Sequence, residues 1–173
     1  MFSHILGTIA LISILLSLTL VFTWIQDFNK INTIKIKLGE ITNYVASEII
    51  SVSALSNLGE INGTNNYYYV KLDIPKTIEG YAYNLTIIKQ NGKYYLKAYL
   101  TLKTWVSTQT ELSFSEGGYI EPLYSGKGEI DNTGIFYSSE IQSSVVEPLI
   151  ICFNCTLANP SNSNLCISLG YRG

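Results

Sequence analysis

The three cysteines, Cys152, Cys155 and Cys166, are the residues best placed to do chemistry in this sequence. A zinc site would need a second cysteine pair or nearby histidines, and the single histidine, His4, lies at the other end of the chain. A redox Cys-x-x-Cys motif normally opens a helix, whereas Cys152 and Cys155 fall in an apolar run typical of a strand. The pattern predicts a structural role, as one disulfide or as buried thiols, and leaves the pairing open.

Four carboxylates, Glu111, Glu116, Glu121 and Glu129, are the other candidates for catalysis. Paired carboxylates hydrolyse glycosides, but acids on a polar β domain are usually solvated surface groups. A nucleophilic triad needs a base, and the only histidine is near the amino terminus. The sequence therefore predicts no enzyme, no metal and no cofactor, and an extracytoplasmic hydrolase or redox protein is the weakest of the hypotheses.

Asn-x-Thr triplets begin at Asn62, Asn84 and Asn154, and each could accept an N-linked glycan. Asn62 lies in a Gly/Asn-rich loop and Asn84 on the polar face of an expected hairpin. Asn154 overlaps a cysteine and an apolar run, so it is the weakest of the three. Glycans at these positions would place the domain outside the membrane.

The amino-terminal segment, residues 5–25, contains no charged side chain. As a helix it would span about 30 Å, the thickness of a hydrocarbon core. A signal peptide would need a basic region before the apolar run and a small-residue cleavage site after it, and neither is present. We therefore expect a retained helix, with Trp24 as an anchor at the membrane interface.

The same helix is expected to continue to about Leu55, because apolar residues recur at spacings of three and four. Gly39 weakens the helix without ending it, and Leu58-Gly59 is a plausible stop. The apolar stripe must pack on the chain's own β domain or on neighbouring copies, and its length favours the second. The stripe consists of Ile31, Ile34, Leu38, Ile41, Val45, Ile49, Val52 and Leu55.

The rest of the chain is typical of a β domain, rich in Tyr, Thr, Ser, Asn and Gly. Asn91-Gly92 predicts a two-residue hairpin between strands 83–90 and 93–100. That loop fixes the register, with Tyr83 opposite Leu100, Leu85 opposite Ala98 and Ile87 opposite Leu96 on the apolar face. Further strands are expected at 67–74, 101–114, 127–130, 134–141, 145–157 and 165–169. The predicted fold class is α+β, with a helix over residues 1–58 and an antiparallel β-sandwich-like domain over residues 59–173.

The charges give weaker guidance. A net charge of −2 provides no basic field, so nucleic acid is not expected as a partner. Lys30, Lys35 and Lys37 follow the apolar run, and the positive-inside rule would hold them in the cytoplasm. Large domains translocate despite such charges, and we expect the β domain on the outside.

The opening Ser3-His4-Ile5-Leu6-Gly7-Thr8-Ile9, the long helix and the β domain after it resemble the archaeal type IV pilin-like superfamily, which includes pilins and archaellins. The resemblance implies helices bundled into a filament core, with glycosylated β domains facing outward. It also implies subunits that wait in the membrane and are extracted by an assembly platform and ATPase. Such filaments serve adhesion, aggregation or motility. The resemblance therefore predicts a homopolymer at the cell surface.

Two departures from the family pattern matter. No Lys or Arg precedes Ile5, whereas prepilins carry a basic leader, so the sequence either starts at the mature residue or is never processed. The second case is similar to membrane-anchored archaellum accessory proteins, whose β-sandwich binds other surface components. Position 5 is also Ile rather than an acidic residue. An unpolymerised anchored binding module is accordingly the alternative to the filament subunit.

For a filament subunit, the helix-core residues expected to mediate polymerisation lie on both halves of the helix. They are Ile5, Leu6, Ile9, Ile12, Leu16, Leu20, Trp24, Ile31, Ile34, Leu38, Ile41 and Val45.

Overall fold

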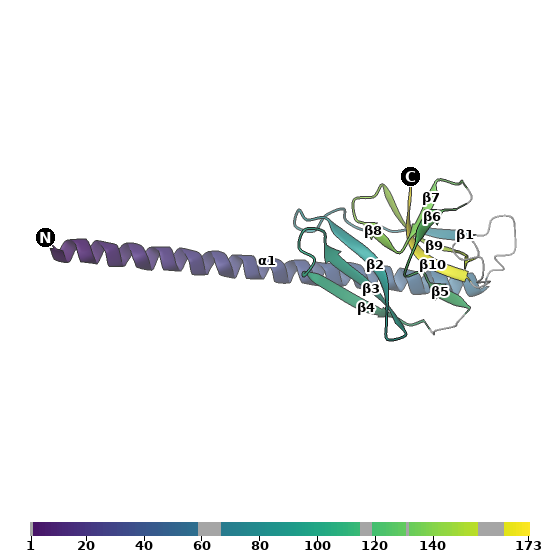
Figure 1. Ribbon diagram of the computed structural model, residues 1–173, viewed down its shortest axis with the longest axis horizontal. Coiled ribbons are helices and arrows are strands. Elements are labelled where there is room, and N and C mark those ends of the chain that lie inside the picture. Colours follow the sequence, from purple (N-terminus) through teal and green to yellow (C-terminus); the bar gives the residue numbers. More distant parts are fainter. Residues whose placement is uncertain (1, 59–66, 115–118, 131, 156–164) are drawn as a thin grey trace. The chain divides into compact units, whose positions relative to one another are not determined.

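The computed structural model describes residues 2–58, 67–114, 119–130, 132–155 and 165–173, with side chains from residue 6 to residue 56 of the helix. One helix, α1, covers Phe2–Leu58, and ten strands follow it in the described residues (Figure 1). The chain divides into two compact units, Met1–Ile34 and Lys35–Gly173. The predicted α+β class is confirmed, and α1 lies within the 1–58 segment expected as helix.

The strands form two sheets. Their bounds are β1 Tyr67–Lys71, β2 Tyr83–Gln90, β3 Lys93–Leu100, β4 Ser107–Leu112, β5 Ile120–Pro122, β6 Lys127–Glu129, β7 Ile135–Ser138, β8 Glu140–Gln142, β9 Glu147–Asn154 and β10 Leu165–Arg172. The four-stranded sheet has the order β4-β3-β2-β8. The six-stranded sheet has the order β1-β9-β10-β7-β6, and β5 pairs with β10 beside that path.

The β2–β3 hairpin confirms the predicted register in every pair, from Tyr83 opposite Leu100 to Gln90 opposite Lys93. Asn91 and Gly92 have φ values of 51° and 77°, as a tight turn between twisted strands requires. Side chains alternate along both strands, so Leu85, Ile87 and their partners are buried while the polar set faces outward. The turn residues and the apolar alternation therefore specify the same pairing.

The six-stranded sheet differs from the expectation in two ways. β5 was not foreseen, and it pairs with β10 in parallel, so this sheet is not wholly antiparallel. The stretch 134–141 divides into β7 and β8, which join different sheets on either side of Ser139. The segment expected as one strand therefore carries the chain from one sheet to the other.

The central strands β9 and β10 have buried side chains on both faces. One face carries a cluster that includes Ile151, Phe153 and Tyr137, in which the Tyr137 and Phe153 rings are 4.8 Å apart. On the other face, Cys152 meets the Ser56 hydroxyl of α1. Strands buried on both faces explain why residues 148–153 form a continuous apolar run instead of an alternating one.

Within the second unit, α1 packs against both sheets. Thr42 Oγ1 lies 3.5 Å from Thr108 Oγ1 of β4, and the Thr110 hydroxyl donates to Asn43 Oδ1 at 2.7 Å. Leu38, Ile41, Val45, Ile49 and Val52 are all buried. The apolar stripe is thus covered by the chain's own β domain, and the expectation that neighbouring copies cover it is wrong for these residues.

Candidate interaction surface on the amino-terminal helix

The apolar half of α1 is uncovered. Every side chain described between Leu6 and Lys30 is exposed, and the most apolar stretch of the helix has 0% of its residues buried. By length and composition, α1 is able to cross a membrane. A signal sequence would satisfy the same criterion, whereas the core helix of a soluble protein would be mostly buried. The large exposed side chains here are Leu6, Ile9, Leu11, Ile12, Ile14, Leu15, Leu16, Leu18, Leu20, Val21, Phe22, Trp24, Ile25 and Phe28.

Four hydroxyl side chains in this half bond to the helix itself. The hydroxyls of Ser13, Ser17, Thr19 and Thr23 each donate to the carbonyl oxygen four residues earlier, at 2.8–2.9 Å. A hydroxyl moved from water into an apolar environment without a partner costs several kcal/mol (about 2–7). Because these four keep a partner, the surface tolerates a dry environment, whether lipid or a helix bundle.

A shallow groove runs along one side of this half, lined by Ser13, Ile14, Ser17, Leu18 and Val21. The small serine side chains make the depression, and small residues let a second helix approach closely. Ser13 and Ser17 were not among the residues predicted to mediate polymerisation, although their spacing of four is visible in the sequence.

Trp24 and Phe28 end the apolar half. Their rings stack at a centroid distance of 6.0 Å, one helical turn apart. The first charges are introduced by Asp27 and Lys30, which lie on either side of Phe28 in the sequence. An aromatic pair at the boundary between apolar and charged residues is typical of a helix at a membrane–water interface.

The residues expected to mediate polymerisation separate into two groups. Leu6, Ile9, Ile12, Leu16, Leu20 and Trp24 are exposed and available, and the side chain of Ile5 lies outside the described residues. Ile31 is half-buried.

The prediction is wrong for four of these residues, because their side chains are buried within the chain and cannot contact another subunit. They are Ile34, Leu38, Ile41 and Val45. Leu55, the last residue of the predicted stripe, is 52% exposed and does not belong to the core.

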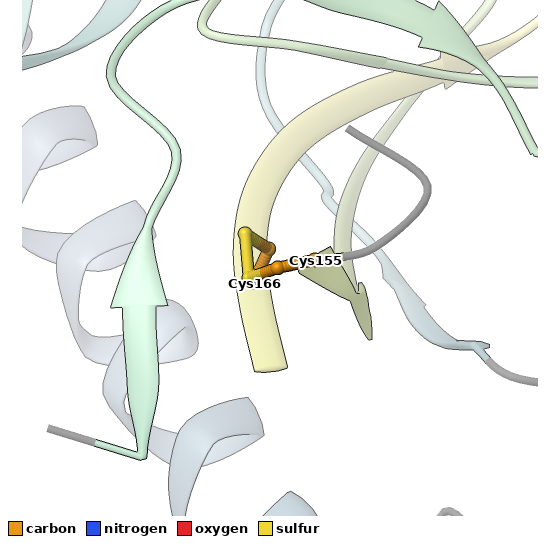
Figure 2. Close-up of a disulfide and its surroundings, with 2 residues drawn as sticks. All are labelled: Cys155 and Cys166. Carbon is orange, nitrogen blue, oxygen red and sulfur yellow. A yellow bond between two sulfur atoms is a disulfide. The ribbon is translucent and has the colours of Figure 1, made fainter. Parts of the chain in front are cut away.

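The disulfide joins Cys155, just after β9, to Cys166 in β10 (Figure 2). Cys166 lies opposite Phe153, so its side chain shares a face with Phe153 and Cys155. Cys152 points to the opposite face, where it is a buried free thiol. Burial raises the pKa of the Cys152 thiol, and the Ser56 hydroxyl lowers it in part. The pairing left open by the sequence is therefore Cys155–Cys166.

The glycosylation candidates have different surroundings. The Asn84 side-chain amide donates to Glu140 Oε1 at 2.7 Å and to the Tyr99 hydroxyl at 3.2 Å. Burial, together with the Tyr99–Glu140 hydrogen bond, raises the pKa of Tyr99. Asn154 is half-buried at the end of β9, and Asn62 lies outside the described residues. A glycan at Asn84 would have to break this network, and glycosylation stays a prediction at all three positions.

Three of the four carboxylates considered for catalysis lie on three different strands. Glu111 of β4 forms an ion pair with Lys93 at 2.8 Å, and Glu129 of β6 accepts from the Gly134 amide at 3.0 Å. Glu121 is on β5, and Glu116 lies outside the described residues. The part of the chain that the structure describes holds no group of three His, Cys, Asp or Glu able to bind a metal ion.

Fold and surface together define a class: an α+β chain in which an uncovered apolar helix joins a disulfide-bonded β domain. In comparisons with protein-family models, with curated proteins and with solved structures, nothing matches this chain. Function is therefore inferred from the residues and their geometry.

Proposed function

We propose that this protein is a structural subunit of an extracellular type IV pilus-like filament, held in the membrane by α1 before assembly. In the assembled state the same half of α1 would pack against other copies of itself. The role proposed is mechanical and adhesive, with no enzymatic activity and no cofactor. Extraction from the membrane would use the assembly platform and ATPase that the pilin-like resemblance implies.

One observation carries the proposal: α1 is divided sharply into an uncovered half and a covered half. Apolar side chains are exposed all around the helix from Leu6 to Phe28, whereas the stripe from Leu38 to Val52 is buried. A lone chain in water would leave an apolar surface far larger than soluble monomers expose. Lipid covers such a surface before assembly, and neighbouring helices cover it afterwards.

Two further features support close packing between helices. The hydroxyls of Ser13 and Ser17 donate to backbone carbonyls of their own helix, so they lose no hydrogen bond in a helix bundle without water. The groove beside them provides a site for a second helix. The amino-terminal resemblance to archaeal pilins favours the same arrangement.

The disulfide supports an extracytoplasmic β domain. Disulfides persist in oxidising compartments and are rare in the cytosol of mesophiles. Cys155–Cys166 is buried beside β9 and β10, so it belongs to the core of this domain. This agrees with an outward-facing domain rather than one held inside by Lys30, Lys35 and Lys37.

A second candidate is a membrane-anchored surface binding module that does not polymerise. The observation that favours it is the burial of Leu38, Ile41 and Val45 within the chain. The β domain covers the apolar stripe on the second half of α1. Only the exposed first half therefore needs an apolar environment, and a lipid bilayer alone would supply it.

Electron microscopy of material sheared from native cells, with mass spectrometry of its protein, distinguishes the two candidates. A filament subunit appears in the sheared fibres, and its density shows a bundle of helices at the fibre axis. If the chain is found only in membranes while other fibres shear off normally, the filament proposal fails and the anchored module stands.

A further inference from the structure

The turn between β3 and β4, residues 101–106, displays two large apolar side chains. Leu102 is 84% exposed and Trp105 is 63% exposed. The turn is held by two backbone hydrogen bonds, from the Leu100 amide to Val106 O at 3.1 Å and from the Val106 amide to Lys103 O at 2.8 Å. Val106 is fully buried beneath it. Leu102 and Trp105 are thus presented by a fixed turn.

This turn lies at the end of the second unit where α1 enters it. Thr108 of β4 lies beside Gly39 and Thr42, and Thr110 lies beside Asn43, so β4 runs along α1 in the direction of its carboxyl end. Residues 101–106 precede β4 and therefore project toward Lys35, the first residue of the unit.

A neighbouring turn lies at the same end. Glu79 forms an ion pair with Lys37, close to where α1 enters the unit. The Lys103 ammonium lies 5.5 Å from the centre of the Tyr81 ring, which joins this turn to residues 101–106. This end of the domain therefore gathers Leu102, Trp105 and several lysines.

These side chains match the chemistry of a lipid surface. Tryptophan favours the boundary between headgroups and acyl chains, leucine inserts beside it, and lysine is attracted to lipid phosphates. Lys35 and Lys103 supply positive charge at this end of the domain. Two projecting apolar side chains are too few for a stable protein interface, which commonly engages about 20–30 residues a side.

Chain connectivity limits the distance between Lys35 and the apolar half of α1. Lys35 follows Phe28, the last residue of the apolar half, by seven residues. That distance is about 10 Å as helix and at most about 25 Å fully extended.

We propose that Leu102 and Trp105 rest in the headgroup region of the bilayer while the subunit is membrane-bound, as a second contact besides α1. The proposal rests on the membrane insertion proposed above. It gives the β domain a lipid-facing end before assembly.

The chain has two tryptophans, which makes a direct test available. Trp24→Phe leaves Trp105 as the reporter, and Trp105→Phe leaves Trp24. A third variant, Trp24→Phe with Trp105→Phe and Tyr119→Trp, moves the reporter to a position of similar exposure (64% for Tyr119) beside β5, at the opposite end of β9 from the β8–β9 turn that lies beside Tyr83, as a matched control. Each full-length variant is reconstituted in vesicles of equal parts phosphatidylcholine and phosphatidylglycerol, with and without a spin label on the lipid headgroup.

Headgroup quenching of Trp105, with a blue-shifted emission and no quenching of the single tryptophan in the control variant, is the expected result. Quenching of Trp24 but not of Trp105 overturns the lipid contact while keeping membrane insertion. Absence of quenching at both Trp24 and Trp105 removes membrane insertion, and the lipid contact with it. Quenching of Trp105 and of the control reporter alike would mean that the whole domain lies on lipid, and would overturn a specific contact by this turn.

Discussion

At the level of single residues, strand alternation decides which cysteines can bond. Cys155 and Cys166 share one face of neighbouring strands, whereas Cys152 faces α1. Cysteine spacing alone could not distinguish the pairs, because the decisive fact is where β9 ends and how β10 aligns with it. The hairpin register, by contrast, was predictable, because Asn91-Gly92 fixes it locally.

Loss of the disulfide should destabilise the β domain. Replacing Cys155 and Cys166 with Ala is expected to lower the free energy of unfolding by about 3 kcal/mol, since the bond closes a short loop in the unfolded chain. Urea denaturation in detergent micelles, followed by tyrosine circular dichroism, measures the loss. A reductant should lower the urea midpoint of unfolding of the natural chain and leave that of the variant unchanged. Equal urea midpoints for the two chains without reductant would contradict the prediction.

The buried thiol of Cys152 should resist alkylation. Its pKa is raised, so less thiolate is present at any given pH and reaction begins only at higher pH than for an exposed cysteine. Ser56→Ala removes the hydroxyl that lowers this pKa, and should shift the onset to still higher pH. Iodoacetamide labelling across a pH series, read by mass spectrometry, tests both statements, with urea-unfolded chain as the fast reference. Equal rates in the folded and unfolded chain would refute them.

At the level of elements, the length and periodicity of α1 were predictable, but its partner was not. Apolar residues spaced by three and four predict that one face of the helix is buried, but they do not identify the element that covers it. The buried face continues from Val52 to Ser56, which contacts Cys152 of β9, and leaves Leu55 exposed, because the position of the sheet decides which side of the last turns is covered. β5 was not predicted for a similar reason. It is only three residues long and pairs in parallel with β10, which is distant in the sequence, so no local sequence pattern indicates it.

Leu38 and Leu55 make a matched pair for testing which residues of α1 belong to the core. Leu38→Ala should cost about 2–5 kcal/mol of unfolding free energy because it empties a fully buried position. Leu55→Ala, at an exposed position, should cost less than about 0.5 kcal/mol. The same urea denaturation gives both values. Comparable losses at the two positions would mean that the β domain does not cover the stripe as described.

At the level of the whole molecule, filament assembly through the apolar half of α1 should tolerate a change in side-chain shape better than the introduction of a charge. Leu20→Asp is expected to abolish filaments, because an unpaired buried charge costs several kcal/mol (about 3–5) at each copy. Leu20→Ile keeps the apolar surface and should assemble normally. Counting fibres by negative-stain microscopy compares the two. Carbonate extraction checks that the Asp variant still enters the membrane, and normal fibres from that variant would rule out a core built from this half of α1.

If the β domain faces outward, as proposed, the disulfide has a consequence for its encounter with proteases. Its two sulfurs bracket residues 156–164, and β10, which begins just after them, lies between β9 and β7 in the sheet. A single peptide-bond cut anywhere between Cys155 and Cys166 would therefore leave both pieces covalently joined. On a gel the nicked protein would run as one band without reductant and as two with it, and the central strand would stay in place after the backbone had been severed.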